Sequence, residues 1–383
     1  MKNKKNIIIN STESIYSKET GGLGIFTNKF AKLLCKLDYK VTVVVCSDVK
    51  KKIIKNNIDY IFLKIDNLFF KILKKISHII YLIVRSLIYN YHLKCIINKK
   101  NNIKLIHFPN YGFLQLFYKN AKIKTSCRIS SLEYLWNSNK NYIYLFFTSY
   151  LEKKCLKKAN IIFTPSTFLK KKLYQRFKLN SYYLPQIYEE SKIKKTKIKK
   201  KFILIIGSIS SGKGGDYIAD NINNILPSSM NLIWIGNIDK NYISSHSEYQ
   251  KKLKNKLKEN LNRKIYIKKF IKQNKLMEYI NSSSLVLFPA FRENSPNSLL
   301  ETIGQYKFFI ARKNVGYDDF SIKNKNCFLF DDNNGNQLKK LIKKYLKNKR
   351  KYDLLGKINN KKLIKKFTEN DLKKKITFLL RKI

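Results

Sequence analysis

The chain has 383 residues, more than one ordinary core accommodates, and 44% of them are hydrophobic, which predicts two domains and excludes a disordered protein. Its formal net charge is +54, but only 8 of its 79 basic residues are arginine. Recognition of phosphates and bases usually recruits arginine as well, so this balance favours codon bias from an AT-rich genome over dedicated nucleic-acid binding. Such a surface still attracts anionic lipids and nucleotides non-specifically.

The first half of the chain alternates short apolar runs with helix-length segments, as in parallel sheets covered by helices. The run at 6–10 predicts a first strand rather than a signal peptide. Strands are also predicted at 40–47, 58–65, 103–109 and 121–130, helices at 21–39 and 141–159, and a strand, turn and helix across 160–177.

A basic apolar stretch at about 66–100 contains the longest apolar run, at 78–93. This run is too short to span a bilayer and is interrupted by Arg85. Lysines interleaved with Ile, Leu, Tyr and Phe fit a helix that lies on a membrane surface. They fit a buried helix of the first domain equally well, because lysine is abundant throughout the chain.

A charged segment without apolar periodicity, 189–201, is the predicted linker. The alternation restarts after it, with strands predicted at 202–208, 230–237, 264–270, 284–291, 308–314 and 327–330 and basic helices from about 336 to 383. The expected fold class is α/β, with two doubly wound Rossmann-like domains facing a central cleft. The predicted domains are 1–188 and 202–365, followed by a C-terminal helix, 366–383, that packs back on the first domain.

A glycine-rich loop, GSISSGKGGDY, follows the first strand of the second half. Its flexibility would let backbone N–H groups and a helix N-terminus face a phosphate, and Lys213 would add a positive charge. The loop lacks the Walker spacing, and a plain strand-to-helix turn is an equal alternative.

The segment FRENSPNSLLETIG (291–304) places two carboxylates near a strand end and a helix start. Facing one cleft, Glu293 and Glu301 could act as general acid and base, or accept hydrogen bonds from a sugar and a ribose. The amides of Asn297 and Ser298 could bind an anion at the helix start. The alternative is that Glu301 merely favours a first helical turn and Glu293 is solvated.

In the first half, Gly21, Gly22 and Gly24 directly precede a helix and would let the backbone approach a phosphate or sugar. Their spacing does not match GxGxxG. His107 follows a strand, which is a candidate ligand position, although a lone histidine there is more often structural.

Neither a metal site nor a disulfide framework is expected. The Asp pairs at 318–319 and 331–332 are typical of turns and have no ligand-spaced partners. The six cysteines form no CxxC pair and indicate small buried residues in a reducing compartment.

Three features together resemble the retaining glycosyltransferases of family 4, the glycosyl transferases group 1, which have the GT-B fold. These are the Gly-Gly-x-Gly loop, the Lys-Gly loop and the Glu-x7-Glu segment ahead of a glycine. The resemblance covers nearly the whole chain, including KKANIIFTPSTFLKKKL and YYLPQIYEES at the end of the first domain. It implies that 1–188 binds the acceptor and that 202–365 binds a nucleotide-sugar donor.

The resemblance implies a role for each charged residue of the donor site. Glu293 would lie near the donor sugar, Glu301 would accept hydrogen bonds from the ribose, and Lys213 would neutralise the diphosphate leaving group without a metal or other cofactor. The implied donor site comprises Gly22, Gly24, Gly207, Ser208, Lys213, Ser295, Pro296, Asn297, Ser298, Leu299 and Glu301.

Two positions depart from the family. Ser208 stands where the family usually has an arginine, so leaving-group stabilisation is weaker or comes from another basic residue. The family histidine near the donor sugar follows a strand like KTSCRIS, where this chain has Arg128, while His107 lies one strand earlier. Both are candidate acceptor or sugar contacts, and neither is assigned.

The leading prediction is therefore a hexosyl-type glycosyltransferase that uses a UDP- or GDP-sugar and a glycan or lipid-linked acceptor in cell-surface polysaccharide or lipopolysaccharide synthesis. It would be cytoplasmic, either free or peripheral at the inner face of the membrane, where an anionic surface is a candidate partner. No specific nucleic acid is expected. The alternatives are a basic nucleic-acid-binding protein without enzymatic activity and a catalytically decayed GT-B protein that binds a nucleotide-sugar.

Overall fold

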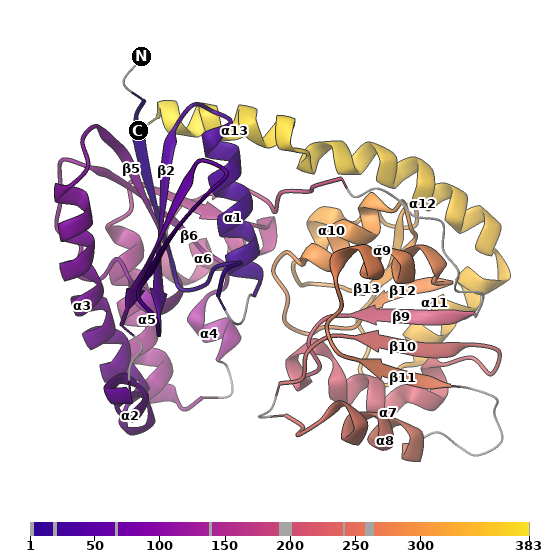
Figure 1. The fold of residues 1–383 in the computed structure, drawn as a ribbon. Coiled ribbons are helices and arrows are strands. Elements are labelled where there is room, and N and C mark those ends of the chain that lie inside the picture. Colours follow the sequence, from indigo (N-terminus) through magenta and orange to yellow (C-terminus); the bar gives the residue numbers. More distant parts are fainter. Residues whose placement is uncertain are drawn as a thin grey trace. The chain divides into compact units, whose positions relative to one another are not determined.

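The computed structural model describes residues 4–17, 21–65, 68–137, 140–190, 201–239, 242–256 and 264–382. The chain divides into two compact units, one made of Met1–Ile187 and Glu369–Ile383 and the other of Tyr188–Thr368. Each unit is a mainly parallel sheet flanked by helices (Figure 1). Of the predicted linker, residues 191–200 lie outside the described part of the chain.

The first unit has an eight-stranded sheet in the order β3-β4-β2-β1-β5-β6-β7-β8. β3 pairs antiparallel with β4, and the other neighbours that the structure describes pair in parallel. Ile7 and Ile9 of β1 pack into one core and Ile8 packs into another, so both faces of the strand are buried. The strands are β1 (Asn6–Ser11), β2 (Lys40–Ser47), β3 (Lys51–Lys55), β4 (Ile58–Lys64), β5 (Ile103–Pro109), β6 (Lys124–Arg128), β7 (Ile161–Thr164) and β8 (Tyr182–Tyr183).

Helices cover both faces of this sheet. α1 (Gly22–Cys35) and the C-terminal α13 (Glu369–Arg381) pack on one face, and α2 (Leu68–Ile76), α3 (His78–Asn98) and α5 (Tyr142–Lys157) pack on the other. α1 turns Phe26, Phe30, Leu33 and Leu34 toward the sheet, at the spacing of one helical face. The remaining elements of the unit are η1 (Tyr111–Phe113), α4 (Glu133–Trp136) and α6 (Thr167–Phe177).

The basic apolar stretch at 66–100 forms two helices rather than one. α3 buries six side chains along its length, whereas α2 buries only Phe70. The break falls at Ser77, whose hydroxyl accepts a hydrogen bond from the Ile80 N–H and begins α3. Within the described residues, every helix falls short of the length and apolarity needed to cross a membrane.

A buried carboxyl group links the loops that follow β5 and β6. Glu152 of α5 is 0% exposed and accepts hydrogen bonds from Asn110 Nδ2 at 2.9 Å and from the Glu133 N–H at 3.2 Å. Burial, together with the negative charge of Glu133, raises the pKa of Glu152 to about 8. Glu152 therefore holds its proton at neutral pH.

Glu152 is expected to lower the free energy of unfolding as pH rises from about 4.5 to about 8. Across this range the folded protein keeps a proton that the unfolded chain has released, so a higher pH favours unfolding. Glu152→Gln, which stays neutral, should flatten this slope and be more stable than the wild type above about pH 8. Urea denaturation at several pH values measures the slope. The exposed control Glu190→Gln should keep the wild-type slope, and an unchanged slope in Glu152→Gln would contradict the assignment.

The second unit has a six-stranded sheet in the order β11-β10-β9-β12-β13-β14, with parallel pairing throughout the described residues. Both units are thus open parallel α/β sheets, and the predicted α/β class with two Rossmann-like domains is confirmed. The strands are β9 (Phe202–Ile206), β10 (Asn231–Ile235), β11 (Ile265–Lys268), β12 (Leu285–Phe288), β13 (Phe309–Arg312) and β14 (Cys327–Phe330).

Helices of the second unit also cover both faces of its sheet. α7 (Gly215–Ile225), α8 (His246–Lys256) and α11 (Asn336–Lys347) pack into one core, and α9 (Gln273–Ser282) and α10 (Asn297–Gly304) pack into the other. α12 (Lys349–Leu363) contributes to both cores through Tyr352 and Leu363. Short helices complete the unit: η2 (Ser211–Lys213), η3 (Asp318–Phe320) and η4 (Ile364–Phe367).

Candidate active site

β9 and β12 are neighbours in the second sheet although β10 and β11 separate them along the chain. The strand order therefore reverses between them, with β10 on one side of β9 and β12 on the other. Ligands of open α/β sheets bind at such a reversal, outside the carboxyl ends of the strands. The loop 207–214 follows β9 and the loop 289–296 follows β12, so the two motifs of the second half meet at this position.

Backbone contacts hold the two loops together. The N–H groups of Phe291 and Arg292 both donate to the carbonyl oxygen of Gly212, at 3.0 and 3.1 Å. Gly214 has a φ of +86°, and a Cβ atom at this position would lie 2.7 Å from the carbonyl oxygen of Pro289. Glycine is therefore required where the loops meet, because any other residue would be both strained and in collision.

The side chains of Lys213 and Glu293 form an ion pair between the loops. Lys213 Nζ lies 2.5 Å from Glu293 Oε2, and the two side chains are 17% and 18% exposed. The pair borders a cavity of about 140 Å³. Five predicted site residues line this one cavity: Gly207, Ser208, Lys213 and Ser298, which were predicted to bind the donor, and Glu293, which was predicted with Lys213 to be catalytic.

The segment after β13 supports Glu293. The Gly316 N–H donates to the carbonyl oxygen of Glu293 at 2.9 Å, and a Cβ atom at 316 would lie 2.1 Å from the carbonyl oxygen of Asn294. Tyr317 is buried and lines the cavity. Burial, together with the negative charge of Glu293, raises the pKa of Tyr317 far above its ordinary value, so its hydroxyl stays protonated.

The N-terminus of α10 lies at the cavity through Ser298. The preceding residue, Pro296, supplies no side-chain cap, so the partial positive charge of the first turn is not offset by a capping oxygen. Ser295 is buried, and its Oγ has no hydrogen-bond partner within the described residues. The Leu299 side chain is 0% exposed and packs into the core. The predicted contact of Leu299 with the donor would therefore have to be made by its backbone amide.

Glu301 lies farther along α10 and is not part of the cavity lining. It is half-buried, and its Oε1 accepts a hydrogen bond from Gln273 Nε2 at 3.4 Å. Glu293 and Glu301 therefore do not both line this cavity. Its geometry does not support the alternative in which the two act together as general acid and base. The contact of Glu301 with a ribose stays a prediction.

Arg312, which the sequence reasoning missed, joins the loops behind Glu293. It lies at the end of β13, donates from Nε to the Pro289 carbonyl at 3.3 Å and donates from Nη1 to the Asp332 carbonyl at 3.0 Å. Its guanidinium group lies 3.8 Å from the ring centre of Phe291. A lysine could not make both hydrogen bonds and this stacking contact. An arginine within a predicted strand, in a chain with so many lysines and so few arginines, was the available signal.

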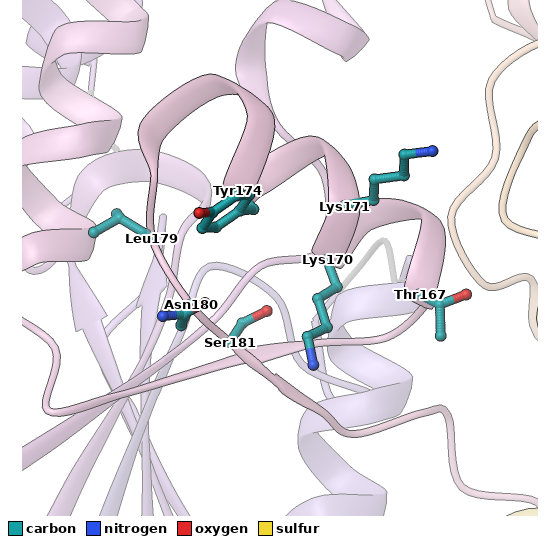
Figure 2. A pocket seen from close by; sticks show the side chains of 7 residues that line it. All are labelled: Thr167, Lys170, Lys171, Tyr174, Leu179, Asn180 and Ser181. Carbon is teal, nitrogen blue, oxygen red and sulfur yellow. The ribbon is translucent and has the colours of Figure 1, made fainter.

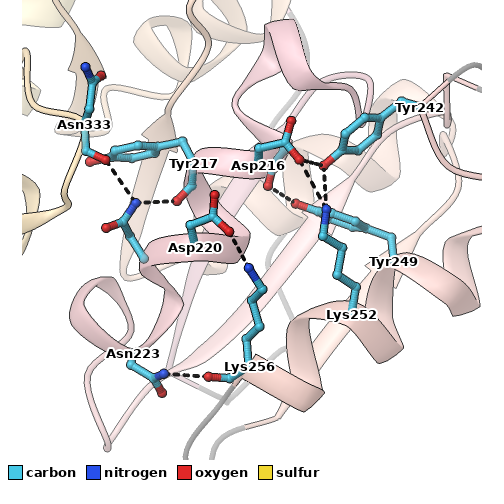
Figure 3. Close-up of polar contacts among 11 residues, drawn as sticks. Asp216, Tyr217, Asp220, Asn223, Tyr242, Tyr249, Lys252, Lys256 and Asn333 are labelled. Carbon is cyan, nitrogen blue, oxygen red and sulfur yellow. Dashed lines mark hydrogen bonds and ion pairs between the residues drawn. The ribbon is translucent and has the colours of Figure 1, made fainter.

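A polar cluster fixes the start of α7, directly after Lys213 (Figure 3). Asp216 accepts a hydrogen bond from the Tyr242 hydroxyl at 2.8 Å and pairs with Lys252 Nζ at 3.2 Å. The Tyr249 hydroxyl donates to the Gly215 carbonyl at 2.8 Å. α8 and the segment that precedes it thereby hold the end of the lysine loop.

In the first unit, a carboxylate occupies the glycine loop that was predicted to approach a phosphate or sugar. Glu13, which the sequence reasoning missed, accepts hydrogen bonds from the N–H groups of Gly21 at 2.9 Å and Gly24 at 3.2 Å. Gly22 is exposed at the first position of α1, and Gly24 is buried. The donor contacts of Gly22 and Gly24 stay predictions.

His107 is enclosed in the first unit. It is 3% exposed, lies against Phe30 and Phe163, and its Nδ1 is 2.9 Å from Ser126 Oγ. Burial, with a smaller effect of the positive charge of Arg128, lowers the pKa of His107 to about 3. This placement favours the structural alternative over a contact with a sugar.

Arg128 ends β6 and is also buried. Its guanidinium lies 3.6 Å from the ring centre of Phe26, and Nη1 donates to Ser130 Oγ at 3.3 Å. Nε and Nη2 have no hydrogen-bond partner in the part of the chain that the structure describes. Burial lowers the pKa of Arg128 to about 9. An acceptor or sugar contact of Arg128 stays a prediction.

A cavity of about 240 Å³ lies along α6 in the first unit (Figure 2). Its lining includes exposed Lys170, Lys171 and Tyr174, and buried Ser181, which shares a hydrogen bond with Thr164. Two surface lysines do not select a ligand in a chain of this composition, so we assign this cavity no role.

In the described ranges no three His, Cys, Asp or Glu side chains are grouped to hold a metal ion, and the absence of a metal requirement stays a prediction.

Residues 187–362, which span most of the second unit and somewhat less than half of the chain, match the family model of the glycosyl transferases group 1. The structure resembles sucrose-phosphate synthase from Thermosynechococcus elongatus, with 14% identity, 99% of both chains covered and a TM-score of 0.77. It also resembles HepE from Anabaena in complex with UDP and glucose, with 12% identity, 98% of this chain and 100% of that chain covered, and a TM-score of 0.70.

A third similar structure is the trehalose-6-phosphate protein from E. coli bound with UDP-2-fluoro glucose, with 10% identity, 98% of this chain and 99% of that chain covered, and a TM-score of 0.73. At such identities these likenesses show the fold, which is GT-B as predicted. The family match supports a glycosyltransferase. A comparison with curated proteins gives no match.

Proposed function

We propose that this protein is a retaining family 4 glycosyltransferase that moves a hexose from a nucleotide-diphosphate-sugar to a glycan or lipid-linked acceptor. The observation that carries the proposal is the Lys213–Glu293 pair at the reversal of strand order, inside the segment that matches the glycosyltransferase model. UDP and UDP-sugar in the similar structures support a uridine donor, with a GDP-sugar as the second choice.

The proposed chemistry follows from charge. During transfer the bond between the sugar and the diphosphate breaks, the sugar gains positive character and negative charge accumulates on the leaving group. Lys213 Nζ and the N–H groups at the start of α10 would stabilise that negative charge, and the Glu293 carboxylate would lie beside the sugar. Ser208, at the position where the family usually has an arginine, lines the same cavity. Lys213 would therefore supply more of the positive charge that stabilises the leaving diphosphate. This scheme needs no metal or other cofactor.

The acceptor and the pathway rest on the resemblance. We propose that the first unit binds the acceptor and that the reaction belongs to cell-surface polysaccharide or lipopolysaccharide synthesis. The cytoplasmic face of a membrane is the proposed place of action, because lipid-linked acceptors are held there.

A specific nucleotide-sugar is expected to raise the melting temperature by about 5 °C at saturation, because a ligand that binds only the folded state stabilises it by mass action. A thermal-shift screen with UDP-, GDP-, ADP- and CMP-sugars, beside a polyanion control, measures this. The shift should be lost in Glu301→Ala and kept in Glu278→Ala, which changes a glutamate of the neighbouring α9.

The screen also separates the alternatives. Equal shifts with every anion, including the polyanion, would overturn the proposal and favour a nucleic-acid-binding protein. A base-specific shift without any turnover would favour a decayed GT-B protein.

A further inference from the structure

Arg312 lies among three aromatic rings at the carboxyl end of the second sheet. Its guanidinium carbon is 3.8 Å from the ring centre of Phe291, 4.6 Å from that of Tyr217 and 4.7 Å from that of Phe330. These rings, here called the aromatic box, come from the loop after β12, the first turn of α7 and the last residue of β14. Cation–π contacts are strongest where the cation is desolvated, and Arg312 is only 3% exposed.

The hydrogen bonds of Arg312 reach the same segments. Nε donates to the Pro289 carbonyl, which follows β12, and Nη1 donates to the Asp332 carbonyl, which follows β14. The Tyr217 hydroxyl donates to Asp332 Oδ1 at 3.0 Å, which ties the start of α7 to the loop after β14. One side chain therefore holds together the ends of three neighbouring strands, β12, β13 and β14, and the helix that follows the lysine loop.

Both members of the Lys213–Glu293 ion pair are attached to segments that Arg312 holds. Glu293 is two residues beyond Phe291 of the aromatic box, and Lys213 is four residues before Tyr217. Arg312 itself is not part of the cavity lining, whereas Lys213 and Glu293 are. An effect of Arg312 on chemistry in this cavity must therefore act through the residues that it holds in place.

We propose that Arg312 is a positioning residue for sugar transfer, which sets the separation of Lys213 and Glu293 by holding the segments that carry them. Lysine at 312 would keep the charge but lose the two-armed hydrogen bonding and the flat stacking contact, so these segments would occupy a wider range of positions. A displacement of about 1 Å at a reacting group can cost about a hundredfold in rate. The proposal rests on the proposed function for the reaction, but not for the separation of the pair.

Transfer kinetics give the first test. Arg312→Lys and Arg312→Met should lower kcat by roughly thirtyfold and leave the donor KM within about threefold of the wild type, because the pair is needed most when charge builds up on the leaving group. Arg350→Met, which removes an exposed arginine from α12, should have the wild-type kcat. Wild-type kcat in both Arg312 variants would overturn the proposal.

A control for stability separates positioning from a general weakening of the second unit. Ile280→Ala removes a fully buried side chain of α9 from the core of this unit and should lower the melting temperature. Assayed at a temperature where it is folded, it should keep the wild-type kcat. If Ile280→Ala loses as much kcat as Arg312→Lys, then loss of stability explains both, and the proposal is wrong.

A second test needs no substrate. Urea denaturation of the wild type, Lys213→Ala, Glu293→Ala and the double variant gives the coupling free energy of the ion pair. The same cycle in an Arg312→Lys background should give less than about half of this coupling, whereas an Ile280→Ala background should give all of it. If Arg312→Lys does not fold, Phe330→Leu, which removes one ring of the aromatic box and keeps the arginine, should also lower the coupling.

The two tests distinguish failure of this proposal from failure of the proposed function. Full coupling in the Arg312→Lys background, with active wild-type enzyme, would overturn the positioning role and leave the proposed function intact. Reduced coupling, with no sugar transfer by the wild type, would support Arg312 as the residue that positions the pair and count against the proposed function.

Discussion

Lys213→Ala is expected to lower the rate constant of sugar transfer by about two to three orders of magnitude. Lys213 Nζ is the cation at the cavity, and its charge would be needed most when the diphosphate departs. Removing it also leaves the largely buried Glu293 carboxylate without this ion-pair partner. Single-turnover transfer with the donor found by thermal shift measures the rate.

Glu293→Gln should give a loss of similar size with the fold intact, because the pair acts as a unit. The control is Lys251→Ala, which removes an exposed lysine from α8 of the same unit and should transfer at the wild-type rate. Wild-type melting temperatures of all three variants would show that the lower transfer rates reflect the loss of site residues and not unfolding. Wild-type transfer by both Lys213→Ala and Glu293→Gln would refute the site.

Gly316→Ala should destabilise the protein by about 3 kcal/mol and also reduce transfer. The added Cβ would fall 2.1 Å from the Asn294 carbonyl oxygen and within 2.4 Å of the Asn294 Cα, so backbone rather than a flexible side chain must move. That movement displaces Glu293, whose carbonyl oxygen accepts the Gly316 N–H. Urea denaturation gives the free energy of unfolding.

Gly22→Ala is the matched control for stability, since no atom lies within 4 Å of a Cβ built at Gly22. Alanine also favours the first turn of α1, so the free energy of unfolding should stay the same or rise slightly. If both alanine variants unfold at the same urea concentration, the close approach of Gly316 to Asn294 does not limit stability.

The sheets were predictable because their strands are buried on both faces. β2 and β9 are almost continuous runs of buried residues. A short run so rich in β-branched residues is typical of a buried strand and does not fit a solvent-exposed helix. β3, an edge strand of lysines and isoleucines, was missed because its five residues, KKIIK, do not alternate between apolar and polar. The break between α2 and α3 was missed because it depends on one serine cap inside a long apolar stretch.

The candidate site was predictable where its residues follow strands in recognisable motifs. Lys213 and Glu293 are 80 residues apart in the chain, and the reversal between β9 and β12 brings them into contact. Arg312, Gly316 and Tyr317 were missed because their roles arise from the closeness of separate loops. His107 shows the converse: its place at a strand end made it a candidate ligand, although a structural role was the more frequent alternative, and the neighbouring phenylalanines enclose it.

The second unit is one uninterrupted piece of chain, whereas the first is assembled from both ends of the sequence. The two ends of the second unit meet, since the Tyr188 N–H donates to the Phe367 carbonyl at 2.9 Å and Tyr188 forms a β-bridge with Thr368. A segment whose two ends lie close together can be replaced by a related segment without disrupting the fold of the rest of the chain. On the proposed function, in which the second unit binds the donor, recombination at these two points would change the sugar-nucleotide preference and leave the first unit unchanged. The same two points are the boundaries for building such chimaeras.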